Sequence, residues 1–216
     1  MASKDKQNNP RVILAIDYGT TFTGLSWMEV LADGSHTTHK LFEDWPGLSS
    51  RKVPSAVSYT GSSDGQQQWG HDIQTGSEVL RWTKLELRQG TRVDELKKLR
   101  ATVVPAHLCM DAEDIITDYL KKVTRRWFEH MSAHNASTLR NVPLDVVITN
   151  PAEWPYTAKN KTVRAVHSAL SPGRFPTLRR TYLCSEPMAS ALYTAHSASM
   201  KDRARLMPVS RFSCIE

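Results

Sequence analysis

The sequence predicts an α/β protein in which helices flank a mixed sheet that carries an inserted α+β subdomain. Two apolar, β-branched runs, at residues 11–17 and 144–149, indicate strands buried in a core. In the second half of the chain, strand signals alternate with segments of helical periodicity, which favours a sheet covered by helices. The stretch between, residues 45–105, has short strand signals and a mixed helical segment instead.

The N-terminal part of the chain is expected to form a β-hairpin. Residues 11–17 are an apolar run that ends at an Asp, and residues 18–21 are typical of a short turn. Residues 22–31 then return to strand-like composition. Asp33 and Gly34 indicate a second turn, after which we expect a third strand at residues 36–44.

Residues 45–105 are expected to form a small subdomain of their own. Strands are predicted at residues 53–60 and 67–73, on either side of a loop rich in Gly and Ser, and a helix is predicted at residues 78–88. The expected organisation is a flexible N-terminus at 1–10, a core subdomain made of 11–44 and 106–205, the insertion 45–105, and a C-terminal tail at 206–216.

The clearest helix signal begins at Asp111. This residue is a good N-cap, and Asp114 lies in the first turn, where negative charge favours the helix dipole. Apolar residues recur on one face of the helix at Ile116, Tyr119, Leu120, Val123, Trp127 and Met131. Further along the chain we predict a strand at 144–149, a helix at 157–170, a strand at 181–184 and a helix at 188–200.

Composition and charge exclude several classes of function. Hydrophobic residues make up 40% of the chain and charged residues 23%, which is ordinary for a soluble globular protein. The net charge is +6, but the main basic runs lie on predicted helices beside acidic residues, so we expect solvated helix faces and no nucleic-acid partner. No apolar run is long enough for a membrane span. The three cysteines lack a CxxC spacing, and no secretory signal is present, which favours a cytoplasmic protein.

The segment DYGTTF, residues 17–22, has the chemistry to bind a polyphosphate. Gly19 has no Cβ, so the backbone can approach phosphate oxygens closely, and Thr20 and Thr21 add hydroxyl donors. Asp17, at the end of a buried strand, can hold a hydrated Mg²⁺, an ion that keeps waters and takes few carboxylates. The alternative is a plain hairpin in which the Asp and the Gly are only turn residues.

Residues 16–24, IDYGTTFTG, resemble the first phosphate loop of the superfamily of actin, hexokinase and heat-shock ATPases. Two later segments agree in order and spacing. VVITNPA at 146–152 resembles the family's strand followed by Pro-Ala, and SEPMASAL at 185–192 resembles its Glu-Pro helix start. The chain is most similar to the heat shock protein 70 family, in particular to divergent fungal-type members. The resemblance covers about residues 10–208 and implies lobe I of the actin-like ATPase (ribonuclease-H-like) fold.

The resemblance also implies a ligand and the residues that hold it. The ligand is ATP or ADP with Mg²⁺, bound at the bottom of a cleft between two lobes. Asp17 would contact the metal through water. Gly19, Thr20, Thr21 and Phe22 would cradle the β- and γ-phosphates.

Three further positions take their expected roles from the same resemblance. Lys84 would reach the γ-phosphate from the insertion, Glu186 would lie near the attacking water or the metal shell, and Pro151 would be the hinge that couples nucleotide state to partners. The residues alone allow other interpretations: Lys84 as an exposed helix lysine, and Glu186, before Pro187, as a carboxylate favoured by the helix dipole. Pro151 could simply end a strand.

The sequence also departs from the family. Lys159 is the nearest basic residue where the family carries an Arg, and Asn150 stands in place of a small apolar residue. The family's second phosphate loop, Asp-x-Gly-Gly-Gly-Thr, is absent, and residues 209–216 do not resemble the family. We therefore expect a truncated ATP-binding lobe of a chaperone-type ATPase with little or no hydrolysis alone. Its partners would be nucleotide and a missing second lobe or co-chaperones.

Other classes of function remain as alternatives. An interaction or remnant module would fold without binding nucleotide, and a sugar kinase would share the first phosphate loop. A ribonuclease-H-type nuclease needs several clustered carboxylates, and only Asp17 and Glu186 are candidates. His130 and His134 lie four residues apart on a helix, but no carboxylate or Cys completes a metal site at useful spacing, so solvated histidines are expected.

Overall fold

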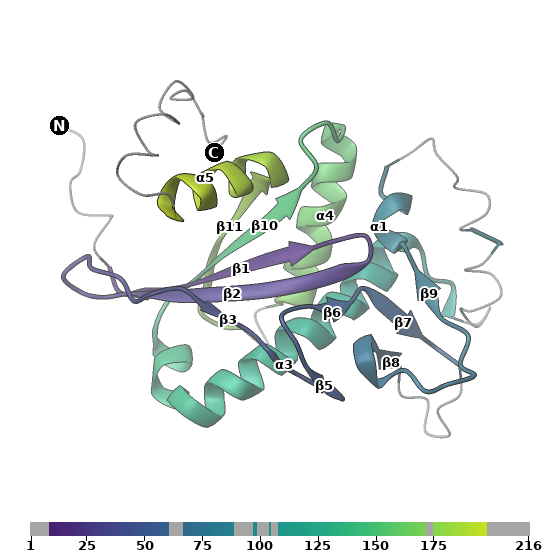
Figure 1. The fold of residues 1–216 in the computed structure, drawn as a ribbon, viewed down its shortest axis with the longest axis horizontal. Helices are drawn as coiled ribbons and strands as arrows, with labels where there is room; N and C mark the ends of the chain where they lie inside the picture. The colour runs from purple at the N-terminus through teal and green to yellow at the C-terminus, as the bar shows by residue number, and fades with distance from the viewer. Residues whose placement is uncertain are drawn as a thin grey trace.

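The computed structural model describes residues 9–60, 67–88, 97–98, 104, 108–171 and 175–197, which form a mixed sheet flanked by helices (Figure 1). The predicted α/β class is confirmed at this level. Most of the expected N-terminal segment 1–10 and all of the expected tail 206–216 lie outside the described residues. Within the described residues, no helix combines the length and the apolar character needed to cross a membrane.

The central sheet has the strand order β11-β10-β1-β2-β3. The strands in this order are β1 (Arg11–Tyr18), β2 (Phe22–Val30), β3 (Lys40–Leu41), β10 (Leu144–Asn150) and β11 (Leu178–Ser185), and a sixth strand, β6 (Val53–Pro54), pairs with β2. The predicted hairpin is confirmed, because β1 and β2 pair antiparallel, with Asp17 opposite Gly24. On its other side β1 pairs parallel with β10, and β10 pairs parallel with β11. Three strands therefore end at the same edge of the sheet.

One face of the sheet packs on two helices, α3 (Ala112–Asn141) and α4 (Tyr156–Ala169). Alternate residues of β1 are buried, and the last of them, Tyr18, lies with its ring centroid 5.9 Å from that of Tyr119 on α3. Trp27 of β2 meets Trp127 of α3 in the same way, at 6.5 Å. The predicted apolar face of the helix is buried throughout: Ile116, Tyr119, Leu120, Val123, Trp127 and Met131.

The predicted start of α3 is also confirmed. Asp114 N donates to Asp111 Oδ1 at 2.9 Å, and Asp111 N donates to Asp114 Oδ2 at 3.1 Å. Two backbone N–H groups that lack a partner within the helix are thereby satisfied reciprocally.

The last described helix, α5 (Glu186–Ser197), contacts β11 and β10 away from α3 (Figure 1). It begins two residues earlier than the predicted 188, because Glu186 and Pro187 already belong to its first turn. Strand β11 is longer than the predicted 181–184. No residue of α5 is buried, and the exposed fractions of Leu192 and Tyr193 are 57% and 65%.

Residues 44–88 form short strands. These are β4 (Asp44–Trp45), β5 (Leu48–Ser49), β6 (Val53–Pro54), β7 (Ala56–Ser58), β8 (Gln68–Trp69) and β9 (Leu80–Arg81), with a 3-10 helix η2 (Gly70–Asp72) and α1 (Thr83–Glu86). Strand β6 pairs with β2 of the central sheet, whereas β7 pairs with β8 on one side and with β9 on the other in a separate sheet.

Four of the predicted boundaries in this region are wrong. The helix expected at 78–88 is limited to α1, because Leu80 is fully buried and pairs with Val57 in a sheet. The strand expected at 67–73 ends at Trp69, because Gly70 has a φ of +62° and starts a 3-10 turn. The strand expected at 36–44 is reduced to a bridge at His36 and to β3 and the start of β4. The strand expected at 53–60 is divided into β6 and β7 at Ser55.

Candidate functional site

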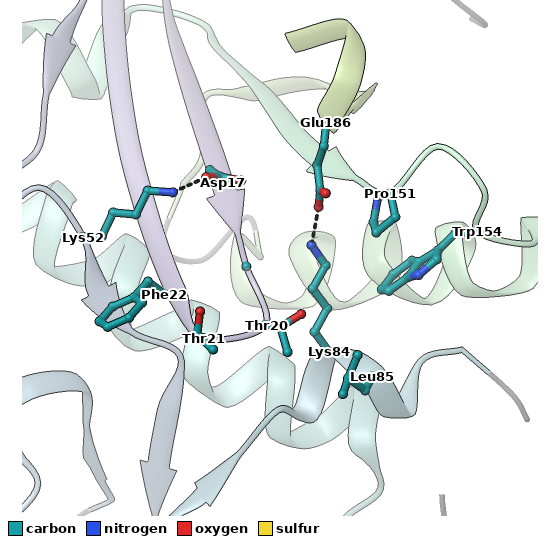
Figure 2. A pocket seen from close by; sticks show the side chains of 11 residues that line it. Asp17, Thr20, Thr21, Phe22, Lys52, Lys84, Leu85, Pro151, Trp154 and Glu186 are labelled. Atoms are coloured by element: carbon teal, nitrogen blue, oxygen red, sulfur yellow. Dashed lines mark hydrogen bonds and ion pairs between the residues drawn. The ribbon is translucent and has the colours of Figure 1, made fainter. Parts of the chain in front are cut away.

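The site lies where the three parallel strands end. Asp17 is near the end of β1, Thr149 near the end of β10, and Glu186 follows the last residue of β11. Ligands of open α/β sheets bind at this edge, beyond the carboxyl ends of the strands. The turn from β1 to β2 and the short helix α1 close the site from the other side (Figure 2).

The turn between β1 and β2 is closed by its own backbone and bonded to Ser55, the residue between β6 and β7. Gly19 N donates to Phe22 O at 3.1 Å, and a Cβ added to Gly19 would lie only 2.3 Å from that oxygen. A side chain at this position is therefore incompatible with the turn. Ser55 N donates to Thr21 O at 2.9 Å, and the buried hydroxyls of Thr23 and Ser55 lie 2.8 Å apart. The turn is thus held as a fixed loop between two strands.

Both carboxylate oxygens of Asp17 have partners. Thr149 donates to Oδ1 at 2.8 Å, and the Lys52 ammonium group donates to Oδ2 at 2.7 Å. Burial raises the pKa of Asp17, but these hydrogen bonds and the nearby positive charges of Lys52 and Lys84 outweigh it and hold the pKa below its ordinary value. Asp17 is therefore ionised at neutral pH.

Lys84 is buried in the site and is not an exposed helix lysine. Its ammonium group lies 2.7 Å from Glu186 Oε1, and only 4% of its side chain is exposed. The same group lies 5.5 Å from the ring centroid of Trp154 and 5.9 Å from that of Tyr18. Two aromatic faces and a carboxylate thus surround the cation.

A hydrogen bond from β1 holds the start of α1, and with it Lys84. The buried Tyr18 hydroxyl lies 2.8 Å from Thr83 Oγ1, which joins the end of β1 to the first residue of α1. Burial raises the pKa of Tyr18, so this hydroxyl stays protonated. Trp82, the residue before α1, has a φ of +62°, an unfavourable region for a bulky residue. Such a conformation persists where the surrounding structure over-determines it, and functional sites are common examples.

A pocket of 430 Å³ gathers these groups. The structure brings together there every residue that the sequence analysis proposed for the site: Asp17, Gly19, Thr20, Thr21, Phe22, Lys84, Pro151 and Glu186. Sequence reasoning missed three lining residues, Lys52, Leu85 and Trp154. Leu85 follows Lys84 and Trp154 follows the Pro-Ala segment, so proximity to these motifs was an available signal. Lys52 gave no such signal, because only the pairing of β6 with β2 brings it to the pocket.

The pocket contains few groups that could bind a metal. No cluster of three or more His, Cys, Asp or Glu side chains occurs among the described residues. The carboxylates that line the pocket are Asp17 and Glu186, and each contacts a lysine. This arrangement does not fit a two-metal nuclease. A hydrated Mg²⁺, which takes few carboxylates, could be held by one of them.

Of the two histidines noted in the sequence, His130 is not simply solvated but contacts a carboxylate. His130 Nδ1 lies 3.1 Å from Asp44 Oδ2, and the same carboxylate oxygen accepts a hydrogen bond from Arg126. The side chain of His134 lies outside the described residues.

No protein-family model matches the chain, and no curated protein matches it either. The functional assignment therefore rests on the three sequence motifs and on the geometry of the pocket.

Proposed function

We propose that this chain is an ATP-binding lobe of a chaperone-type ATPase similar to heat shock protein 70, and that its pocket holds the phosphates of ATP or ADP with Mg²⁺. The observation that carries the proposal is the convergence of three motifs. One pocket at the ends of parallel strands is lined by residues of all three motifs, which are far apart in the sequence: 17 and 19–22, 151, and 186.

The sheet supports the finer fold assignment that the resemblance implies. The antiparallel strands β2 and β3 lie on one side of β1, and the parallel strands β10 and β11 lie on the other. We take this mixed sheet as lobe I of an actin-like, ribonuclease-H-like ATPase fold. The phosphate-binding turn then follows β1, the strand that pairs antiparallel with β2 on one side and parallel with β10 on the other.

Each lining group has a role in this proposal. The backbone and hydroxyls of the turn at Thr20 and Thr21 bind the β- and γ-phosphates. Lys84 places a buried positive charge against the terminal phosphate, where charge changes during phosphoryl transfer. Mg²⁺ would neutralise phosphate charge when bound, and Asp17 holds its water shell. Glu186 orients the attacking water, and Pro151 senses the occupied state.

Hydrolysis by the isolated chain should be slow. The chain contains no Asp-x-Gly-Gly-Gly-Thr segment, so half of the phosphate clamp must come from a second lobe. Without it the reacting groups are not held in position, and most of the rate advantage of a preorganised site is lost. We therefore propose that the chain binds nucleotide in the cytoplasm and depends on a second lobe or a co-chaperone for turnover.

Calorimetric titration of the chain with ATP in the presence and absence of Mg²⁺ tests the proposal. We expect magnesium-dependent binding with a dissociation constant of roughly 0.1–1 mM, because one side of the ligand lacks contacts. A chain that is folded by circular dichroism but shows no binding at several times that concentration would overturn the assignment.

A second candidate is an interaction module that binds no nucleotide. The observation in its favour is the exposure of apolar side chains on α5 and on two strands: Leu41, Tyr182, Leu192 and Tyr193. Exposed apolar side chains are typical of a protein-binding face where they form a contiguous patch. Sedimentation velocity distinguishes the candidates, because this module would self-associate with rising concentration whether or not ATP is present.

A further inference from the structure

Lys52 lines the pocket but belongs to none of the three motifs. It precedes β6, where Val53 pairs with Thr23, and this register sets Lys52 beside Gly24 of β2. The aliphatic part of Lys52 lies against this glycine, since a Cβ built on Gly24 would be 3.5 Å from the Lys52 Cγ and Cε atoms. Ser50 Oγ donates to Lys52 O at 2.6 Å. The backbone is thus fixed, and the stem extends across a strand to the pocket.

The two lysines of the pocket differ in how firmly they are held. Lys84 is enclosed by Glu186 and two aromatic rings, with 4% of its side chain exposed. In the ion pair of Lys52 with Asp17, 52% of the lysine side chain and 44% of the aspartate side chain are exposed. Exposed ion pairs contribute little to stability, so Lys52 can exchange partners at low cost, whereas Lys84 cannot.

The lysines also lie on opposite sides of the phosphate turn (Figure 2). Each ammonium group contacts one carboxylate, Lys52 on Asp17 and Lys84 on Glu186, so the charged lining residues sum to zero. A polyphosphate adds several negative charges at the turn between them. A cation that leaves its carboxylate for the phosphate keeps a charge-assisted hydrogen bond. It also meets the several negative charges of the polyphosphate in place of one.

We propose that Lys52 is a second phosphate-binding residue of the pocket, which exchanges Asp17 for a phosphate oxygen when a polyphosphate binds and thereby leaves Asp17 free for the hydrated Mg²⁺. This inference rests on the proposed function and adds to it a residue that the resemblance does not assign. Lys52 thus acts both as a phosphate ligand and as a competitor of Mg²⁺ at Asp17.

Inorganic tripolyphosphate is the probe, because it offers the phosphate chain without a base or sugar. Titration calorimetry should give an affinity about tenfold weaker for K52M than for the wild-type chain, and K52R should stay within about threefold of wild type. K40M is the matched control, since Lys40 is exposed on β3 and does not line the pocket. We expect K40M to bind as wild type does.

The dependence on Mg²⁺ gives a readout that a purely structural role would not change. With Lys52 removed, Asp17 has no competing cation, so K52M should reach half-maximal binding at a lower Mg²⁺ concentration than the wild-type chain. If K52M kept the affinity and the Mg²⁺ requirement of the wild-type chain while K84M bound weakly, the role of Lys52 would be overturned and the proposed function would stand. Failure of the folded wild-type chain to bind either tripolyphosphate or MgATP would overturn the proposed function as well.

Chemical footprinting of the wild-type chain avoids dependence on the folding of variants. Brief acetylation followed by mass spectrometry should modify Lys52 and Lys40 in the absence of ligand. Saturating magnesium tripolyphosphate should protect Lys52 and leave Lys40 unchanged. Equal modification of Lys52 with and without bound tripolyphosphate would contradict the proposal.

Discussion

At the scale of single residues, Lys84 and Glu186 form an ion pair with unequal exposure: 4% of the lysine side chain is exposed, against 42% of the glutamate side chain. Removing the glutamate leaves a buried ammonium group without its carboxylate, whereas removing the lysine leaves a carboxylate that water can solvate. Removing Glu186 should therefore destabilise the fold more than removing Lys84.

We predict that E186A lowers the free energy of unfolding by roughly 1–3 kcal/mol, whereas K84M changes it by less than about 1 kcal/mol. K84M should nevertheless weaken the binding of MgATP by at least about tenfold. Urea denaturation and calorimetric titration measure the two effects separately. A K84M chain less stable than E186A would contradict the description of this ion pair.

Asp17 gives a prediction for pH. Burial raises its pKa, but hydrogen bonds from Lys52 and Thr149 and nearby positive charge hold it below the ordinary value of 3.8. A carboxylate with a lowered folded pKa contributes stability that is present above its unfolded pKa and lost as the pH falls through the folded pKa.

Between pH 7 and pH 3, the wild-type chain should therefore lose more stability than D17N, by less than about 1 kcal/mol because the Asp17–Lys52 pair is half exposed. Urea denaturation of both chains across this range measures the difference. Parallel stability curves would show that Asp17 is not stabilised in its charged form.

Most of the candidate site could be predicted from the sequence because its residues lie within contiguous motifs, and Lys84, outside these motifs, was predicted from the family resemblance. Asp17 and Glu186 stand at strand ends that local composition already indicates. Lys52 reaches the pocket through the pairing of β6 with β2, and no local pattern records that pairing. Trp154 contacts Lys84 although the two residues are more than sixty positions apart in the sequence. The hydrogen bond from the Tyr119 hydroxyl to Pro54 O spans a similar distance in sequence.

At the scale of elements, the start of α3 depends on the reciprocal hydrogen bonds between Asp111 and Asp114. D111A removes the side-chain acceptor and should lower the free energy of unfolding by about 1 kcal/mol. D118A is a matched control, since Asp118 makes only a partly exposed ion pair with Lys121 one turn further on and should cost a few tenths of a kcal/mol at most. Thermal denaturation of both variants tests the cap, and equal midpoints would refute it.

The elements differ in how well the sequence predicts them. Strand β1 and helix α3 were predictable because a long run of residues carries one periodicity and ends at a turn or a cap. Strands of two residues, such as β8 and β9, have no periodicity to detect. Leu80 forms a strand because β7 offers it a partner in a buried sheet, and this pairing overrides the local helical composition.

At the scale of the whole molecule, the pocket is the point at which distant parts of the chain meet. Strand β1 supplies Asp17, the segment before β6 supplies Lys52, helix α1 supplies Lys84 and helix α5 supplies Glu186. A ligand that contacts all four binds only the folded chain, so it must stabilise the fold as a whole.

In the proposed function, the residues of the pocket bind phosphates, and this leads to the most direct test of the proposal. The proposal assigns the phosphate contacts to Gly19–Phe22, Lys52 and Lys84, and the resemblance assigns the adenosine contacts to a second lobe. The chain should therefore bind a nucleotide mainly through its phosphates, with little contribution from the base.

Calorimetric titration of the chain with MgATP and with magnesium tripolyphosphate, each repeated on K84M, measures this directly. We predict affinities for the two ligands within about threefold of each other, both dependent on Mg²⁺ and both at least about tenfold weaker in K84M. Absence of binding by the folded wild-type chain, or binding that K84M leaves unchanged, would contradict the assignment of this pocket as a phosphate site.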